Sequence, residues 1–231
     1  MKAYDPSDLL ISIHLPKCGG SSLKAALKRW FGKKLYYHYY DEEKNAPPSR
    51  LLSYRIRLSS MMSGGYCVHG HFNKYRGFGI SDYYPNSNQF ISFLRDPLEI
   101  HLSNYYFVNK KVLYRDGERY HLNMDVNKYI EDVIENASSW YMAHFPDDAD
   151  DVPVSEYIES RFVFLGVMED YQKSLDVLAG VLDKPKFEIP KYNVTERDPH
   201  DLDKALVSRF KEVFELDYKI YDYAKSYIDS F

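Results

Sequence analysis

The chain has little of what would place it among secreted or membrane-spanning proteins. Only two of its 231 residues are cysteine, too few for a framework of disulfides, so a reducing cytoplasm is the expected compartment. No apolar run approaches the roughly 18 residues that a membrane-spanning helix needs. The opening residues 1–17 lack both a long apolar stretch and a small-residue cleavage site, so we expect no signal peptide.

The chain also lacks an excess of basic residues. Its 30 Lys and Arg face 34 Asp and Glu, which gives a formal net charge of −4. A general nucleic-acid binder would carry a basic surplus, so nucleic acid is not an expected partner. Any site for an anion therefore has to be local.

What the chain does contain is ordinary globular composition with many aromatic residues. Apolar residues make up 45% and charged residues 28%, which suits one domain over residues 1–231 with its own core. Tyrosine is abundant, with 23 residues. These rings either reflect compositional bias, half-buried with wet hydroxyls, or line a cleft for sugars or bases.

Short apolar segments alternate with segments of helical periodicity. Strands are expected over 9–14, 34–40, 66–69, 89–94 and 161–166. Helices are expected from Ser21 or Ser22 (as the cap) to Gly32, from Pro47 to Gly64, and over 98–111, 125–135, 137–145, 169–182, 200–215 and 216–229. This alternation predicts an α/β fold with a parallel sheet flanked by helices on both faces.

The first expected strand runs into a loop suited to an anion. The segment His14–Leu23 reads HLPKCGGSSL and leads into a helix, whose N-terminal N–H groups and dipole favour a negative ligand. Its glycines allow close approach of the backbone, Lys17 adds a mobile charge, and the Ser21 and Ser22 hydroxyls can donate. An ordinary strand-to-helix turn with a serine cap is the alternative.

The lysine precedes the glycines, so the loop is not a Walker A motif, in which the lysine follows them. That order resembles the 5′-phosphosulfate loop of sulfotransferases that use 3′-phosphoadenosine-5′-phosphosulfate (PAPS). The form is closest to the carbohydrate branch, which includes the heparan sulfate 2-O- and 6-O-sulfotransferases and bacterial relatives. The resemblance implies a P-loop-like sheet and PAPS binding by Pro16, Lys17, Cys18, Gly19, Gly20, Ser21, Ser22 and Leu23. Cys18 stands where Thr is common, and a thiol there would make activity sensitive to oxidation.

A second motif follows the strand expected over 89–94. Residues 94–99, LRDPLE, and Ser103 resemble the segment with which these enzymes bind the 3′-phosphate. Arg95 offers a planar fork and Ser103 a further donor about two helical turns later, so the two can face the same side. Without the resemblance, residues 95–97 would pass for a surface turn with a local ion pair.

A third motif, VHGHF over residues 68–72, ends another expected strand. Histidine titrates near neutrality and can serve as a base, although a histidine at a strand end is more often structural. A third metal ligand at suitable spacing is missing. The motif resembles the HGH segment of the heparan 2-O-sulfotransferase type, which implies that His71 is the base and His69 a supporting or alternate base.

Two later segments bear on how the cofactor and the acceptor would be bound. Residues 191–197 stand where relatives have a loop near the nucleotide, which implies cofactor contacts from Tyr192, Asn193 and Thr195. Residues 138–141, SSWY, do not match the acceptor or cofactor segment that many relatives carry at this place, so acceptor recognition is expected to have diverged. The acidic run over 147–151 would repel polyanions if it bordered the cleft.

The combined reading is a sulfotransferase with PAPS as donor and the desulfonated nucleotide PAP as product, without a metal. His71 would remove the acceptor proton while Lys17 and the loop stabilise charge during in-line transfer. The acceptor would be a hydroxyl-bearing small molecule or glycan. Two alternatives remain: a P-loop nucleotide kinase that uses ATP and Mg²⁺, and a PAPS-binding module without catalysis.

Overall fold

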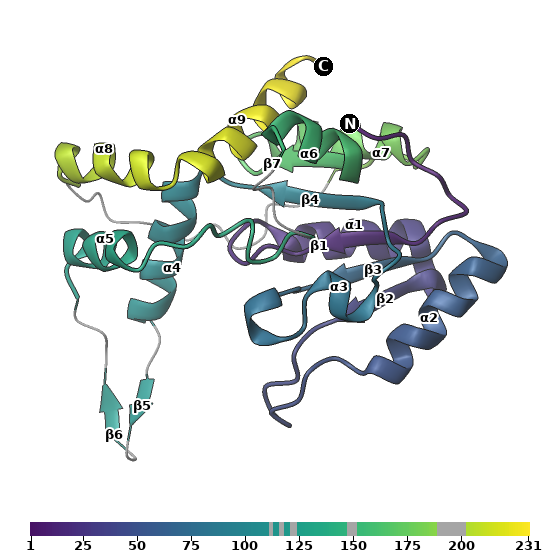
Figure 1. Cartoon of the computed structure of the whole chain (residues 1–231), viewed down its shortest axis with the longest axis horizontal. Helices are drawn as coiled ribbons and strands as arrows, with labels where there is room; N and C mark the ends of the chain where they lie inside the picture. Colours follow the sequence, from purple (N-terminus) through teal and green to yellow (C-terminus); the bar gives the residue numbers. More distant parts are fainter. Residues whose placement is uncertain (111–112, 116–117, 121–123, 147–151, 189–201) are drawn as a thin grey trace.

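The computed structural model describes residues 1–110, 113–115, 118–120, 124–146, 152–188 and 202–231. Its centre is a sheet of five parallel strands in the order β2-β3-β1-β4-β7, flanked by helices (Figure 1). The strands are β1 (Leu10–Ile13), β2 (Leu35–His38), β3 (Cys67–Gly70), β4 (Phe90–Leu94) and β7 (Phe162–Val167). The residues of β1, β3, β4 and β7 are all buried, as expected where helices cover a parallel sheet.

The strand order places a topological switch point at the carboxyl ends of β1 and β4. β1 lies in the middle and pairs in parallel with β3 on one side and β4 on the other. The connections leaving β1 and β4 therefore diverge at the carboxyl ends of these strands. In open α/β sheets ligands bind at such a divergence. The three motifs found in the sequence follow β1, β3 and β4, so all three lie at this edge.

The described residues also form helices between and after these strands. Their bounds are α1 (Gly20–Phe31), α2 (Arg50–Ser63), α3 (Ile80–Tyr83), α4 (Pro97–Lys110), α5 (Val126–Glu135), α6 (Val154–Arg161), α7 (Tyr171–Val181), α8 (Lys204–Val213) and α9 (Glu215–Asp229). Short 3₁₀ turns span Gly32–Lys34 and Lys74–Arg76, and a hairpin is formed by β5 (Leu113–Arg115) and β6 (Glu118–Tyr120).

Two cores hold these elements. The larger core lies between the sheet and its helices. The smaller one joins α4, α5 and α8, which lie beyond one end of the sheet on the left of Figure 1. Its members are Leu102, Val126, Ile130, Ile134, Leu206, Phe210 and Phe214. The smaller core anchors α4, the helix that follows the Arg95 motif.

Each of the five expected strands is present, and so are the helices that follow β1, β4 and β7. The helix expected over 137–145 is wrong: the segment forms turns, because the Asp217 carboxylate of α9 binds it. The serine cap of α1 is also wrong, since Gly19 in the left-handed region takes the cap position without a side-chain bond. The helices α3 and α6 and the β5-β6 hairpin were not predicted.

Within the part of the chain that the structure describes, no helix combines the length and the apolar character needed to cross a bilayer.

Candidate functional site

The loop between β1 and α1 turns sharply at two residues. Lys17 has a φ of 68° and Gly19 a φ of 70°, both in the left-handed region. The N–H of Cys18 bonds to the carbonyl of Leu15 at 3.2 Å, and the Gly19 carbonyl accepts the N–H of Ser22 at 3.1 Å. The chain thus enters α1 with the helix N-terminus at the loop, where first-turn N–H groups have no acceptor within the helix. The arrangement suits a phosphate or sulfate group.

Both glycines of the loop are restricted, Gly19 by its positive φ and Gly20 by the ring packed against it. A Cβ at Gly20 would lie 1.8 Å from the ring of His14, and a Cβ at Gly19 would lie 2.2 Å from the sulfur of Met168. Leu23 is fully buried, so its side chain belongs to the core beneath the loop.

Cys18 is buried in the same loop, with 2% of its surface exposed. Burial raises the pKa of its thiol, so the reactive thiolate is disfavoured. The expectation of an oxidation-sensitive loop therefore has no support in this environment.

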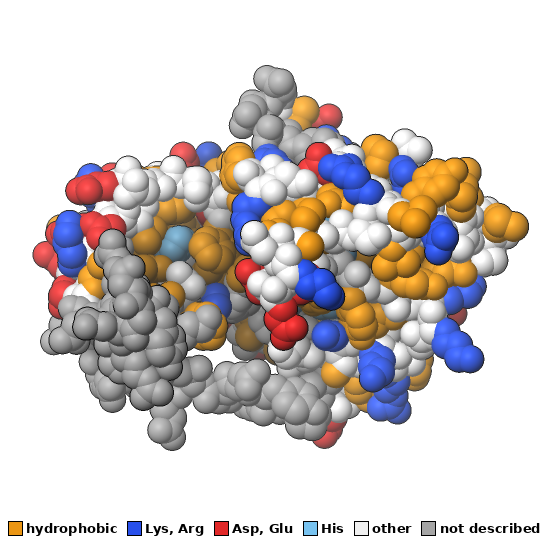
Figure 2. Space-filling model, turned by 90° about the horizontal axis from the view of Figure 1, so that it is seen from below, with side chains coloured by type: hydrophobic (Ala, Val, Ile, Leu, Met, Phe, Trp, Pro, Cys, Tyr) orange, Lys and Arg blue, Asp and Glu red, His pale blue; other side chains and the backbone are white. Residues whose placement is uncertain are grey.

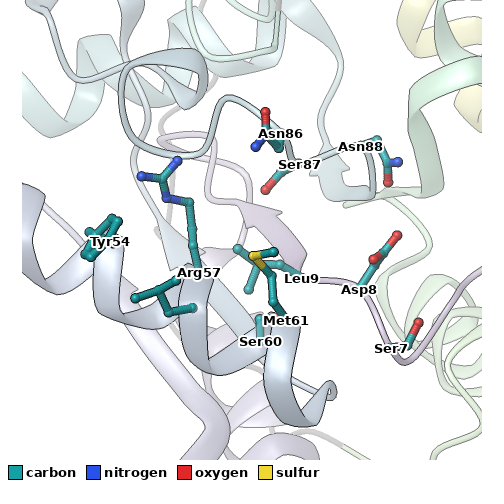
Figure 3. Close-up of a pocket in the computed structure, with 11 residues that line it drawn as sticks. Ser7, Asp8, Leu9, Tyr54, Arg57, Ser60, Met61, Asn86, Ser87 and Asn88 are labelled. Carbon is teal, nitrogen blue, oxygen red and sulfur yellow. The ribbon is translucent and has the colours of Figure 1, made fainter.

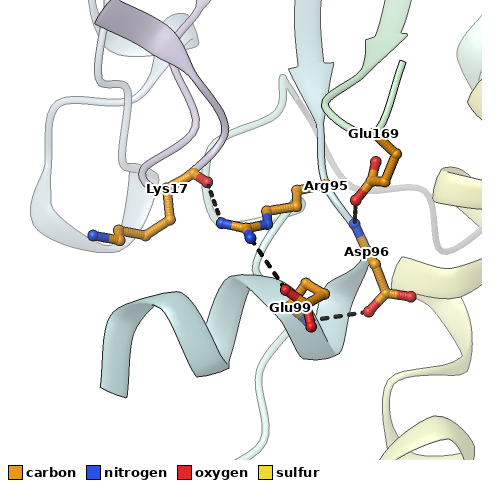
Figure 4. Close-up of polar contacts among 5 residues, drawn as sticks. All are labelled: Lys17, Arg95, Asp96, Glu99 and Glu169. Carbon is orange, nitrogen blue, oxygen red and sulfur yellow. Dashed lines mark hydrogen bonds and ion pairs between the residues drawn. The ribbon is translucent and has the colours of Figure 1, made fainter. Parts of the chain in front are cut away.

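Arg95 connects the second motif with the first (Figure 4). Its guanidinium donates to the Lys17 carbonyl at 3.4 Å and to the Glu99 carboxylate at 3.1 Å. The Lys17 ammonium lies 4.0 Å from the centre of the Phe107 ring on α4. The Arg95 guanidinium therefore contacts the main chain of Lys17 at the carboxyl edge of the sheet, while the Lys17 ammonium points away from Arg95. Each of the two motifs thus places one basic residue at this edge of an otherwise acidic chain.

Carboxylates at the ends of β4 and β7 moderate that charge. Glu169 accepts the N–H of Asp96 at 3.1 Å, and Asp96 accepts the N–H of Glu99 at 3.1 Å (Figure 4). Burial, together with the neighbouring Glu169 and Glu99, raises the pKa of Asp96. These contacts fix the start of α4 relative to β7.

The remaining predicted cofactor residues lie on α4 or outside the described residues. Ser103 lies on α4, partly buried, two turns beyond the Arg95 motif. Tyr192, Asn193 and Thr195 lie outside the described residues, as does the acidic run over 147–151.

His71 lies at the end of β3, directly beside the loop. Its Nδ1 is 2.7 Å from the main-chain oxygen of His14 and must carry the proton, because a carbonyl can only accept. The ring stacks on that of His14 at 4.2 Å between centroids. A neutral imidazole held in this way has its lone pair on Nε2. Burial lowers the pKa of His71, which keeps the ring neutral at physiological pH.

His69 lies deeper than His71. It is fully buried, and its Nδ1 is 3.0 Å from the Ser12 hydroxyl. Burial lowers the pKa of His69 to about 3. The two histidines of the third motif therefore occupy different environments, one at the surface of a cavity and one inside the sheet.

His14, directly after β1, stacks its ring on that of His71. Its Nδ1 is 3.0 Å from the Tyr39 hydroxyl, and burial lowers the pKa of His14 to about 2. Neither its position nor that of Tyr39 beside His71 was predicted, because both depend on the pairing of β1 and β2 with β3.

A cavity of about 620 Å³ opens beside His71 and Pro16. Its lining is rich in aromatic rings, with polar groups among them. The aromatic residues are Tyr39, Tyr40, Tyr75, Phe78 and Trp140, and the polar ones include Glu42, Asn73, Arg76, Ser138 and Ser139. Two sequence signals pointed to this cleft: the abundance of tyrosine, and the segment 138–141.

The turn over 138–146 forms one wall of this cavity and also contacts the Arg95 motif. Asp217 accepts the Trp140 N–H at 2.9 Å and the Ser139 hydroxyl. The Tyr141 hydroxyl donates to the main-chain oxygen of Arg95. One segment thus borders both the cavity and the Arg95 motif.

Among the described residues, no group of three or more His, Cys, Asp or Glu side chains is placed to hold a metal ion.

Comparison with known proteins adds little to this description. No protein-family model matches the chain, and no curated protein matches it. Among solved structures, mouse sulfotransferase SULT7A1 complexed with PAP is similar, with a TM-score of 0.44 and 12% sequence identity. The match covers 93% of this chain and 65% of the mouse chain, so this chain spans less than two thirds of its length. At that TM-score the likeness does not bear on function, and the functional argument depends on the site itself.

Proposed function

We propose that the protein is a sulfotransferase that uses PAPS as donor and a carbohydrate hydroxyl as acceptor. The observation that carries the proposal is that Pro16 of the anion loop and His71 line one cavity. The His71 imidazole thereby lies in the same cavity as the start of the loop that leads into α1. Transfer of a sulfuryl group to a hydroxyl needs these two elements side by side.

The basic side chains and hydrogen-bond donors of the site fit a nucleotide with phosphate groups at both ends. Lys17 and the first turn of α1 would hold the 5′-phosphosulfate, and Arg95 with Ser103 the 3′-phosphate. Glu99 holds the Arg95 guanidinium at 3.1 Å and so pre-orients its fork. When bound, PAPS supplies the sulfuryl group and a phosphate leaving group.

The chain's own groups supply the rest of the chemistry. His71 would accept the acceptor proton at Nε2, because its Nδ1–H is engaged by the His14 carbonyl. Burial of His69 removes it from the cavity surface, so the proposal assigns the base role to His71 alone. Lys17 and the loop N–H groups would stabilise charge on the sulfuryl oxygens, which is typically worth about 2.7–4 kcal/mol per donor.

The lining of the cavity supports a sugar acceptor. Rings such as those of Tyr75 and Trp140 offer flat apolar faces, while Glu42 and Arg76 offer an acceptor and donors for hydroxyls. The two charges are opposite, which suits a neutral or weakly charged glycan better than a polyanion.

A nucleotide kinase is the second candidate, favoured by one observation. Glu169, after β7, accepts the main-chain N–H of Asp96, after β4, so two acidic residues lie at the strand ends where a kinase would hold Mg²⁺. Against it, Lys17 precedes the glycines rather than following them. A PAPS-binding module without catalysis is the third candidate, and the presence of His71 beside the loop argues against it.

Isothermal titration of the wild type with PAP, 5′-AMP, and ATP with Mg²⁺ tests the proposal. The same titrations are made with Lys17→Ala and Arg95→Ala, and with Lys28→Ala, an exposed lysine further along α1, as the matched control. We expect micromolar binding of PAP that weakens sharply in the first two variants and persists in the third. Binding of ATP that equals or exceeds that of PAP, or indifference to Arg95→Ala, would favour the kinase. Binding of PAP without transfer to any of a panel of glycans would favour the module.

A further inference from the structure

The outward face of α2 is more apolar than the face that it buries. Among the described residues twelve large hydrophobic side chains are exposed, and six of them lie on this one helix. They are Leu51, Leu52, Tyr54, Leu58, Met61 and Met62. The buried residues of α2 are Ser53, Ile56 and Ser60, of which two are small and polar. The helix is thus apolar on the side where a helix of a soluble domain is usually polar.

Five of these exposed side chains form one stripe. Leu51, Leu58 and Met62 follow one another at helical spacing, with Tyr54 and Met61 beside them. Met61 and Met62 are 83% and 87% exposed. Figure 2 shows hydrophobic side chains gathered on the right of this face, the side on which α2 lies in Figure 1. Basic side chains stand among them in the same view.

The charges of α2 have one sign. The helix contains Arg50, Arg55 and Arg57 and no acidic residue. The whole chain has a net charge of −4, so this positive helix is a local feature. A second copy of the chain seated face to face on α2 would place arginines against arginines. The charge pattern therefore disfavours self-association and favours an anionic surface.

A pocket of about 270 Å³ borders the stripe (Figure 3). Arg57 and Ser60 line it, together with Asn86 and Ser87 of the loop before β4. Ser60 is 3% exposed, and neither its Oγ nor the Arg57 Nε has a hydrogen-bond partner among the described residues. Buried donors of this kind are normally satisfied, so the pocket has the groups to hold a phosphate oxygen. Its one carboxylate, Asp8, lies on the side of the pocket away from Arg57 (Figure 3).

From these observations we propose that α2 docks the protein on an anionic phospholipid surface. The stripe would enter the boundary between headgroups and acyl chains, the arginines would face lipid phosphates, and the pocket would take one headgroup phosphate at Arg57 and Ser60. The pocket lies at the amino ends of β1 and β4, because Leu9 and Asn88 line it. The proposed transfer site lies at the opposite edge, so docking would leave it open.

Flotation of the full chain with vesicles tests this docking. Vesicles of phosphatidylcholine alone are compared with vesicles that also contain phosphatidylglycerol. We expect binding only to the anionic vesicles, and release as salt is raised. Met62→Glu should abolish binding, and Arg55→Gln should weaken it roughly fivefold, the effect of one basic residue at such a surface. Arg57→Gln should weaken it more than Arg55→Gln, since Arg57 also faces the pocket.

The matched control is Val213→Glu, which adds the same charge at a hydrophobic residue that is 44% exposed on α8. It should bind vesicles as the wild type does. Absence of binding to anionic vesicles at low salt, or equal loss in Val213→Glu and Met62→Glu, would overturn the proposal. So would a dimer in solution that Met62→Glu dissociates, because the stripe would then belong to a second copy. Flotation needs neither PAPS nor turnover, so its failure is independent of the proposed function.

Discussion

The carboxylate of Asp217 accepts the main-chain N–H of Trp140 at 2.9 Å and thereby joins α9 to a wall of the cavity. The two residues are 77 positions apart. The same carboxylate accepts the Ser139 hydroxyl, and Asp217 itself is 1% exposed. A single buried side chain thus sets the conformation of a segment that also reaches the Arg95 motif through Tyr141.

Removal of the Asp217 carboxylate should loosen this wall. Asp217→Ala leaves the Trp140 N–H and the Ser139 hydroxyl without their acceptor, at a cost of about 1–3 kcal/mol in the free energy of unfolding. Urea denaturation measures the loss. Asp222→Ala, also on α9, is the control and should change stability little. An unchanged midpoint for Asp217→Ala would show that the turn holds without it.

The same residue should make stability depend on pH. Burial raises the pKa of Asp217 from 3.8 to about 6. A carboxyl with a raised pKa contributes stability that is fully present below its unfolded pKa and lost as pH rises through the folded value. The unfolding free energy of the wild type minus that of Asp217→Asn should therefore increase as pH falls from about 7 to about 4. A difference that stays flat over this range would contradict the raised pKa.

The proposed base role of His71 predicts a pH profile for transfer. Burial lowers the pKa of His71, so the ring stays neutral, and activity is retained, at pH values below its ordinary 6.5. Activity should decline only at more acidic pH, as the ring gains its proton. His71→Asn should lower kcat by about 10²–10⁴-fold and leave PAP affinity unchanged. An acid limb at or above 6.5, or full activity in the variant, would remove His71 from this role.

Gly20 offers a sharp test of the loop. In Gly20→Ala the new Cβ would lie 1.8 Å from the His14 ring, so the ring and the loop must move apart. Overpacking of this kind typically costs about 1–3 kcal/mol, and PAP affinity should fall roughly tenfold or more. Gly180→Ala is the control: nothing lies within 4 Å of the new Cβ, so this α7 variant should keep its affinity. It should also gain about 0.5–1 kcal/mol in stability. Titration and thermal unfolding of both variants measure these effects.

The aromatic lining of the cavity should affect the acceptor and not the donor. Tyr75 is 68% exposed and lines the cavity, so Tyr75→Ala should raise the acceptor KM roughly fivefold, the value of one ring contact. PAP affinity should not change. Tyr54→Ala, which removes a similarly exposed ring from α2, should leave both constants as they are. Equal effects of the two variants would argue that the cavity does not bind the acceptor.

The sequence was sufficient where short-range patterns decide the structure. The apolar run before Pro16 and the glycines after it predicted β1, the loop and α1, because a buried strand and a helix start each have a local signature. The motifs containing Arg95 and His71 were likewise found from adjacent residues. Parallel strands then bring the three motifs to one edge without further information.

Long-range contacts account for what was missed. Residues 137–145 have helical periodicity, but Asp217 supplies acceptors from another helix and holds them in turns. The place of Tyr39 beside His14 depends on the β2-β3-β1 order, which periodicity does not encode. The prediction of a serine cap was wrong because Gly19 can adopt a φ of 70° and takes the cap position. The Gly19 carbonyl then accepts the Ser22 N–H, the kind of N–H group for which a capping serine oxygen would otherwise be the acceptor.

Both cysteines are free and buried, so alkylation of their thiols reports where the structure opens. Cys18 is 2% exposed in the loop and Cys67 is fully buried in β3, so neither thiol can meet an alkylating reagent until the structure around it separates. The labelling rate at each position therefore measures the free energy of that opening. If Cys18 reacts faster than Cys67, the anion loop unfolds alone, and slowing of Cys18 by a bound nucleotide would report occupancy without any assay of transfer.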